Sequence, residues 1–119
     1  MKAELRGIHS PDVRDLEKYS PKEYDNFGIL IQALIGPSTS IGEESFAFLV
    51  CTPKWIESEM MKDGILFGKG YLIIKEYNYK TILSAIQGLC SRTWGENWDT
   101  IADKLSRFGD WEFEDYQNK

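Results

Sequence analysis

The chain has 119 residues, of which 42% are hydrophobic and 28% are charged, a balance that is typical of one globular domain spanning residues 1–119. Its 14 basic and 19 acidic residues give a formal net charge of −5, which argues against nucleic-acid binding because phosphates require a basic surface. No apolar stretch approaches the roughly 20 residues of a membrane span, and the charged start has no signal-peptide core, so we expect a cytoplasmic protein without membrane contact.

Hydrophobic patterning predicts three strands in the first half of the chain. Residues 2–9 alternate weakly and indicate a strand, after which a polar loop punctuated by proline runs to residue 26. Residues 27–35 are apolar on both faces, which favours a central position in a sheet. Residues 45–51 are predicted to return beside them as the second strand of a hairpin.

A helix is predicted to begin at Thr52-Pro53, because a hydroxyl N-cap followed by proline suits the first helical turn. This helix is short and covers about residues 53–61. The glycine-rich residues 64–70 have the wrong spacing for a phosphate-binding loop and indicate a flexible turn. A further apolar strand is expected over residues 71–77.

The second half of the chain is predicted to contain two more helices and a final strand. Asn78 can cap a helix whose apolar residues keep i, i+3, i+4 spacing, and a second helix carries Trp98, Ile101 and Leu105 inward. Residues 111–114 alternate as an amphipathic strand does. The irregular order of strands and helices favours an α+β fold, with a mainly antiparallel sheet and about three helices packed on one face.

Residues with catalytic or metal-binding potential are few. His9 is the single histidine, and neither a Cys-x-x-Cys nor a His-Glu-x-x-His motif occurs, so we predict no metal, no cofactor and no catalytic residue. Cys51 and Cys90 lie in apolar patterns and are expected to be two reduced core thiols. Glu112 and Glu114 share one face of the final strand, opposite its aromatic residues, where solvation argues against acid–base catalysis.

The excess negative charge is concentrated at the C-terminal end. Residues 1–95 contain 12 acidic and 11 basic residues, whereas residues 96–119 contain 7 acidic and 3 basic residues. Two accounts remain open. Either the acids stabilise a helix N-terminus through its dipole and prevent unwanted pairing at an edge strand, or they steer a basic protein partner. The candidate partner-binding residues are Glu96, Asp99, Asp103, Asp110, Glu112, Glu114 and Asp115.

Several short segments, spread over nearly the whole chain, together resemble a known family. They are Met1-Lys2-Ala3-Glu4-Leu5, His9-Ser10-Pro11-Asp12, Asp25-Asn26-Phe27-Gly28, Gln32-Ala33-Leu34-Ile35-Gly36-Pro37, Glu44-Ser45-Phe46, Val50-Cys51-Thr52-Pro53-Lys54-Trp55, Glu76-Tyr77-Asn78-Tyr79, Trp98, Ile101-Ala102 and Gly109-Asp110-Trp111-Glu112-Phe113. In these segments the chain resembles the bacterial family called immunity protein eight, from polymorphic-toxin and contact-dependent inhibition systems. The Cys-Thr-Pro-Lys-Trp and Trp-Glu-Phe elements are the most specific parts.

The resemblance implies a cytoplasmic antidote that binds the C-terminal domain of a cognate toxin and blocks it. Such toxins are often nucleases with basic substrate-binding surfaces, which an acidic inhibitor would suit. The resemblance implies no individual interface residue, because its motifs are explained as determinants of the fold. Two other functions remain open: a small enzyme that uses the C-terminal carboxylates, and an acidic subunit or regulator of unrelated machinery.

Overall fold

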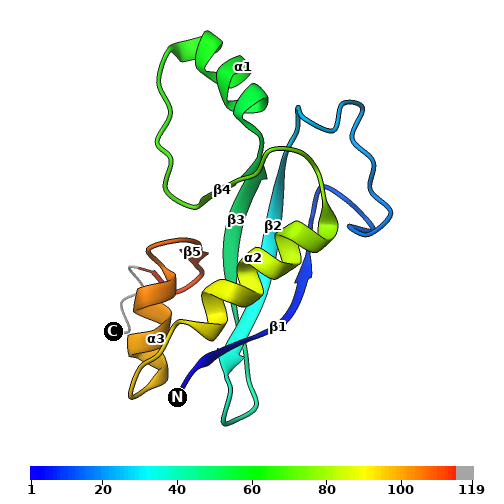
Figure 1. The fold of residues 1–119 in the computed structure, drawn as a ribbon. Coiled ribbons are helices and arrows are strands. Elements are labelled where there is room, and N and C mark those ends of the chain that lie inside the picture. Colours follow the sequence, from blue (N-terminus) through cyan, green and yellow to red (C-terminus); the bar gives the residue numbers. More distant parts are fainter. Residues whose placement is uncertain (115–119) are drawn as a thin grey trace.

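The computed structural model describes residues 1–114, in which five strands and three helices follow one another along the chain (Figure 1). The predicted α+β class, with a mainly antiparallel sheet and three helices, is confirmed. The elements are β1 (Ala3–His9), β2 (Gly28–Pro37), β3 (Glu44–Cys51), α1 (Pro53–Asp63), β4 (Tyr71–Ile73), α2 (Tyr79–Ser91), α3 (Trp98–Leu105) and β5 (Asp110–Trp111).

The sheet is built around the hairpin of β2 and β3. Its strand order is β1-β2-β3-β4, and the β1–β2 and β2–β3 pairs are antiparallel. The outer edge of β3 is shared by two short strands, since β4 pairs in parallel with Leu49–Cys51 and β5 pairs antiparallel with Phe46 and Ala47. The predicted central position of β2 is confirmed, because β1 and β3 pair with its two edges.

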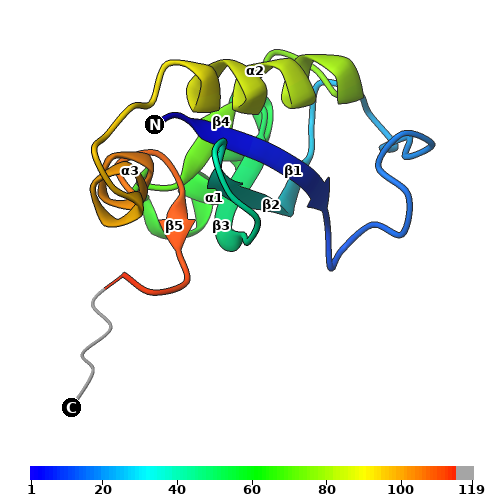
Figure 2. The ribbon, with the colours of Figure 1, turned by 90° about the horizontal axis from the view of Figure 1, so that it is seen from below.

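The core lies between one face of this sheet and the helices α2 and α3. Figures 1 and 2 show α2 crossing that face diagonally, while the opposite face carries no helix over β1 and β2. The strands contribute every second side chain to the core, as a sheet with one covered face must. The largest fully buried members are Ile31, Ile35, Phe46 and Val50 from the sheet and Ile82, Ile86, Ile101 and Leu105 from the helices.

The carboxylate of Glu44 joins α3 to β5 at the start of β3. Its Oε1 accepts hydrogen bonds from the indole Nε1 of Trp98 at 2.6 Å and of Trp111 at 2.9 Å. Both rings also contact Phe46, with Trp111 stacked on it at a centroid distance of 6.3 Å. One acceptor therefore satisfies two half-buried indoles whose N–H groups would otherwise be costly to bury.

The strand predicted over residues 71–77 is shorter in the structure and ends at Ile73. Ile74 still donates its N–H to Cys51, but the chain then turns so that the Tyr77 hydroxyl donates to the carbonyl of Leu16. This long-range bond buries Tyr77 against the polar N-terminal loop and removes it from the sheet. An apolar pattern alone does not distinguish a strand residue from a buried loop residue.

The strand predicted over residues 111–114 is also shorter, because β5 ends at Trp111. A turn follows, closed by a hydrogen bond from the Glu114 N–H to the Trp111 carbonyl. Glu112 and Glu114 are both exposed, but the Glu112 Oε1 also accepts the N–H of Ser45 at 2.7 Å. The alternation in the sequence predicts which face of the strand carries Trp111, but it does not predict that β5 stops pairing with β3 at this residue.

We expect Glu44→Ala to lower the free energy of unfolding by about 2–3 kcal/mol, because hydrogen bonds to a charged group contribute about 1.5–3 kcal/mol and two indole N–H groups lose their acceptor. Glu44→Gln keeps an acceptor oxygen and should cost less. Urea denaturation of both variants measures the effect. Glu43→Ala is the matched control, since Glu43 is exposed and forms no ion pair with the described residues. Equal midpoints for Glu44→Ala and Glu43→Ala would contradict the joining role.

The two cysteines are free and buried, as predicted. Burial raises the pKa of Cys51 and of Cys90 from 9.0 to about 11, so at pH 8 both stay as thiols, which are poor nucleophiles. We expect two thiols per chain to react with a disulfide reagent in denaturant and none within minutes in native buffer. Rapid reaction of the folded protein would contradict this burial.

The same thiols should make stability depend on pH above 9. Between about pH 9 and pH 11 the unfolded chain loses thiol protons that the folded chain retains. The free energy of unfolding should therefore fall as the pH rises, by up to about 1.4 kcal/mol per pH unit for each thiol. Chemical denaturation across this range measures the slope, and a variant with alanine at Cys51 and Cys90 should show a flatter one.

Candidate functional site

The predicted acidic residues divide into two groups, and the first lies on α3. The Asn97 side chain caps this helix by accepting the N–H of Thr100 at 2.9 Å. Glu96 precedes the cap, and Asp99 and Asp103 follow on the solvent side of the helix; all three are exposed. Within residues 1–114 none of the three forms an ion pair. They form a free negative surface that we term the α3 acidic stripe.

The second group lies on and after β5, where the carboxylates have partners inside the molecule. Lys69 Nζ lies 2.6 Å from Glu114 Oε2 and 3.4 Å from Asp110 Oδ1. The hydrogen bond to Glu114 and the nearby negative charges raise the pKa of Lys69. Glu112 is the acceptor for Ser45 described above, and Asp115 lies outside the described residues. This part of the predicted acidic surface is partly neutralised by a lysine from the loop before β4.

Helix α1 has well-formed ends but contributes no buried residue. The Thr52 hydroxyl caps it by accepting the N–H of Trp55 at 3.4 Å, and Gly64 ends it in the left-handed conformation with φ +74°. Trp55 is its main attachment, because the indole covers Gly28 so closely that no Cβ would fit there, and it also contacts Tyr71. The helix and the loop after it therefore project from the end of the sheet (Figure 1).

This projecting segment exposes large apolar side chains. Met61 is 83% exposed, Ile65 63% and Phe67 88%. Together with the exposed Met60 and Ile73 they form a set that we term the α1 apolar surface. Part of it borders a shallow depression lined by Pro53, Ile56, Glu57, Met60, Met61 and Ile73. Contiguous apolar surface on a globular domain indicates a contact site.

The charges beside the α1 apolar surface are mostly paired. Lys54 lies 3.2 Å from Asp25, and Lys62 lies 2.6 Å from Glu59. Glu57 lines the depression, is exposed and forms no ion pair with the described residues. The apolar surface therefore has an unpaired carboxylate at its border, while Lys54 and Lys62 are both paired with carboxylates.

Sequence analysis missed the α1 apolar surface. The pattern predicts only a short helix and a flexible turn here, and the signal that could reveal the surface is the number of apolar side chains among glycine-rich residues 64–70. In a true linker loop these positions are polar. Ile65, Leu66 and Phe67 are consecutive apolar residues in a segment too short to form a covered element.

Metal-binding clusters are not found in the described part of the chain. No group of three or more His, Cys, Asp or Glu side chains is close enough to hold a metal ion among residues 1–114. His9 is exposed and lies against Gln32, with 2.7 Å between its Nε2 and the Gln32 Oε1. None of the helices described here is both long enough and apolar enough to cross a bilayer.

Comparison with known proteins identifies the family but supplies no close relative. No curated protein and no solved structure matches the chain. The model of one family, described as Immunity protein 8, matches residues 3–116, which is nearly the whole chain and includes all eight secondary-structure elements. The resemblance noted in the sequence is thus confirmed, and the chain belongs to the Immunity protein 8 family.

Proposed function

We propose that this protein binds a cognate bacterial toxin domain and neutralises it by protein–protein contact. The observation that carries the proposal is the α1 apolar surface, an unburied group of large side chains on a member of an immunity-protein family. A protein that acts by binding needs an exposed apolar area that a partner can desolvate. On this proposal the protein works without catalysis. The toxin cannot act on its substrate because the immunity protein occupies the toxin surface.

The chemistry of the α1 apolar surface suits the centre of an interface. Methionine and aromatic residues are enriched in such centres, and Met60, Met61 and Phe67 provide them here. The flexible methionine side chains adapt to the shape of a partner at low cost. The unpaired Glu57 at the border favours a partner that places a basic side chain next to its own apolar residues.

We further propose that the α3 acidic stripe attracts the toxin before contact. Glu96, Asp99 and Asp103 are exposed and unpaired within residues 1–114, so their field extends into solvent. A basic surface, such as the substrate-binding face of a nuclease, is attracted by this field. Asp110 and Glu114 contribute less, because Lys69 offsets part of their charge. Glu112 and Asp115 remain proposed contact residues on the strength of their charge alone.

Co-expression with the cognate toxin domain tests the function directly. We expect cells that produce the toxin domain to survive only when this protein is also produced, and we expect the two chains to co-purify. A toxin domain with an inactivated active site should still co-purify, because the proposed inhibition requires binding and no chemical change. Death of cells that make both proteins in soluble form would overturn the proposal.

Replacing the α1 apolar surface should weaken binding without unfolding the protein. Met61→Ser combined with Phe67→Ser removes two side chains that are at least 83% exposed, so the thermal midpoint should stay near that of the parent. Truncating a central interface residue costs about 2 kcal/mol or more, which is about 30-fold in the dissociation constant, so we expect the double variant to raise it by at least that factor. Ile41→Ser is the matched control, since Ile41 is 96% exposed in the distant β2–β3 loop. Calorimetric titrations showing equal affinity for both variants would exclude this surface.

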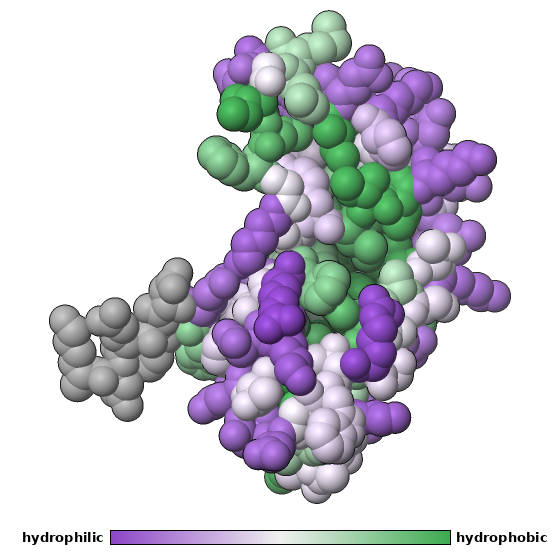
Figure 3. All heavy atoms as spheres, turned by 60° about the vertical axis from the view of Figure 1, so that its left-hand side comes forward, coloured by the Kyte–Doolittle hydropathy of each residue, from purple (hydrophilic) through white to green (hydrophobic). Residues whose placement is uncertain are grey.

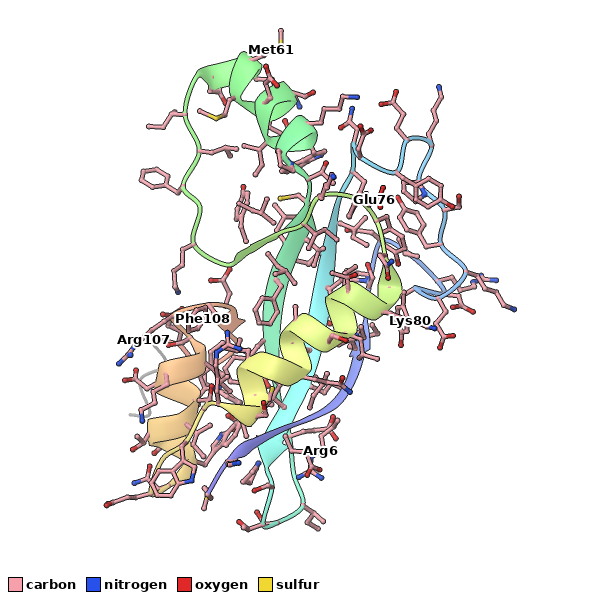
Figure 4. The ribbon with its side chains drawn as sticks, viewed as in Figure 1. Arg6, Met61, Glu76, Lys80, Arg107 and Phe108 are labelled. Carbon is pink, nitrogen blue, oxygen red and sulfur yellow. The ribbon has the colours of Figure 1, made fainter. Side chains whose placement is uncertain are left out.

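Neutralising the α3 acidic stripe should act on the association rate. Glu96→Gln, Asp99→Asn and Asp103→Asn together keep shape and remove charge, so association should slow and depend less on salt. Glu17→Gln, Glu23→Gln and Glu76→Gln remove the same charge from exposed positions away from α3, and Figure 4 shows Glu76 beyond the opposite end of α2. Stopped-flow association at several ionic strengths separates the two variants. The same salt slope for both would show that the stripe does not steer.

A further inference from the structure

A groove separates the half of the molecule that carries α1 from the half that carries α3. Figure 3 shows apolar side chains along the floor of a hollow between these halves, with hydrophilic residues on both sides. The groove has a volume of about 260 Å³ and lies between α2, β4 and the turn after α3. Its apolar walls include Phe48, Tyr71, Leu72, Leu89 and Phe108. Phe108 is 50% exposed and lies in the turn that follows α3 (Figure 4).

Gly88 keeps this groove open at a cost to its own helix. It lies in the interior of α2, where glycine is less favourable than almost any other residue except proline. A Cβ at this position would meet only Arg92 Nη1, at 3.6 Å, which is an ordinary contact with the end of a flexible side chain. The fold therefore does not require glycine here. A position that breaks a local preference without a structural reason indicates a functional one.

Among the described residues that line the groove, Arg92 provides the only charge. It is exposed at the C-terminal end of α2, and within residues 1–114 its guanidinium has no ion pair and no hydrogen-bonded partner. A cation at a helix C-terminus interacts favourably with the helix dipole, but a lysine would serve that purpose equally. An unpaired guanidinium beside an apolar groove presents a fork of two parallel N–H donors, which can bind both oxygens of a carboxylate.

We propose that this groove receives an apolar side chain of the toxin domain, with Arg92 binding an adjacent Asp or Glu of the same segment. The proposal rests on the proposed function for its partner and adds a second contact area whose charge is opposite to that of the α3 acidic stripe. The volume of about 260 Å³ is below the roughly 300–1,000 Å³ of a site for a drug-sized ligand. It suits one large side chain, and its single cation suits one carboxylate.

Gly88→Leu is the variant that separates binding from stability. Leucine fills the groove from within and improves the helix, so the thermal midpoint should rise or stay unchanged. The dissociation constant for the toxin domain should increase at least tenfold. Arg92→Glu should have a similar effect, and Arg92→Lys, which keeps the charge but loses the fork, should weaken binding by a smaller factor. Lys80→Glu is the control, because it makes the same charge change at the other end of α2 (Figure 4).

A second probe tests the groove without the toxin. N-acetyl-Phe-Asp-amide, titrated at millimolar concentration, should shift the amide resonances of Gly88 and Leu89, and N-acetyl-Phe-Asn-amide should do so less. Arg92→Glu should abolish the difference between the peptides. If the toxin domain does not bind but the dipeptide shifts remain, the proposed function is wrong, and the groove binds an apolar side chain beside a carboxylate from another partner. If the toxin domain binds Gly88→Leu and Arg92→Glu as tightly as the parent, the groove assignment is overturned while the proposed function stands.

Discussion

The outer edge of β3 is the constraint on which the rest of the structure depends. Two short strands share this edge from opposite directions, β4 at Leu49–Cys51 and β5 at Phe46 and Ala47. The chain must therefore leave the sheet at both ends of β3, with α1 beyond one end and α3 beside the other (Figure 1). Phe48 lies between the two pairings and forms part of the groove wall. The hollow seen in Figure 3 is thus a product of the topology, because neither short strand is long enough to close it.

The parts of the fold that were predictable are those decided by neighbouring residues. Thr52-Pro53 and Asn78 begin helices as expected, since a cap involves groups only three positions apart. The parallel pairing of β4 and the early end of β5 were not predictable in this way. Both depend on partners far along the chain, because β4 pairs with Leu49–Cys51 and β5 pairs with Phe46 and Ala47. An apolar alternation states which side chains are buried but not which strand edge is free to pair.

The candidate site was predictable in its charge and not in its pairing or its apolar part. Composition located the negative charge at the C-terminal end, and the α3 acidic stripe is indeed exposed there. It did not reveal that Lys69, 45 residues before Glu114, would be brought against that residue. The α1 apolar surface escaped prediction for a related reason. Whether Met61 or Phe67 is covered depends on the direction in which a whole segment leaves the sheet, which no local pattern encodes.

The two apolar areas differ in rigidity, and this difference assigns them different tasks in recognition. The α1 apolar surface is held chiefly by Trp55 over Gly28, and its helix buries no residue, so local opening of this segment costs less than global unfolding. Such a surface adapts to a partner but loses conformational freedom when it binds. The groove lies between α2, β4 and the turn after α3, and its lining residues Phe48, Ile86 and Leu89 belong to the core. On the proposed function, a preformed site with one charge disfavours toxins that leave Arg92 unpaired, and this difference would separate related toxins. Affinity is therefore expected to come mainly from α1 and specificity from the groove.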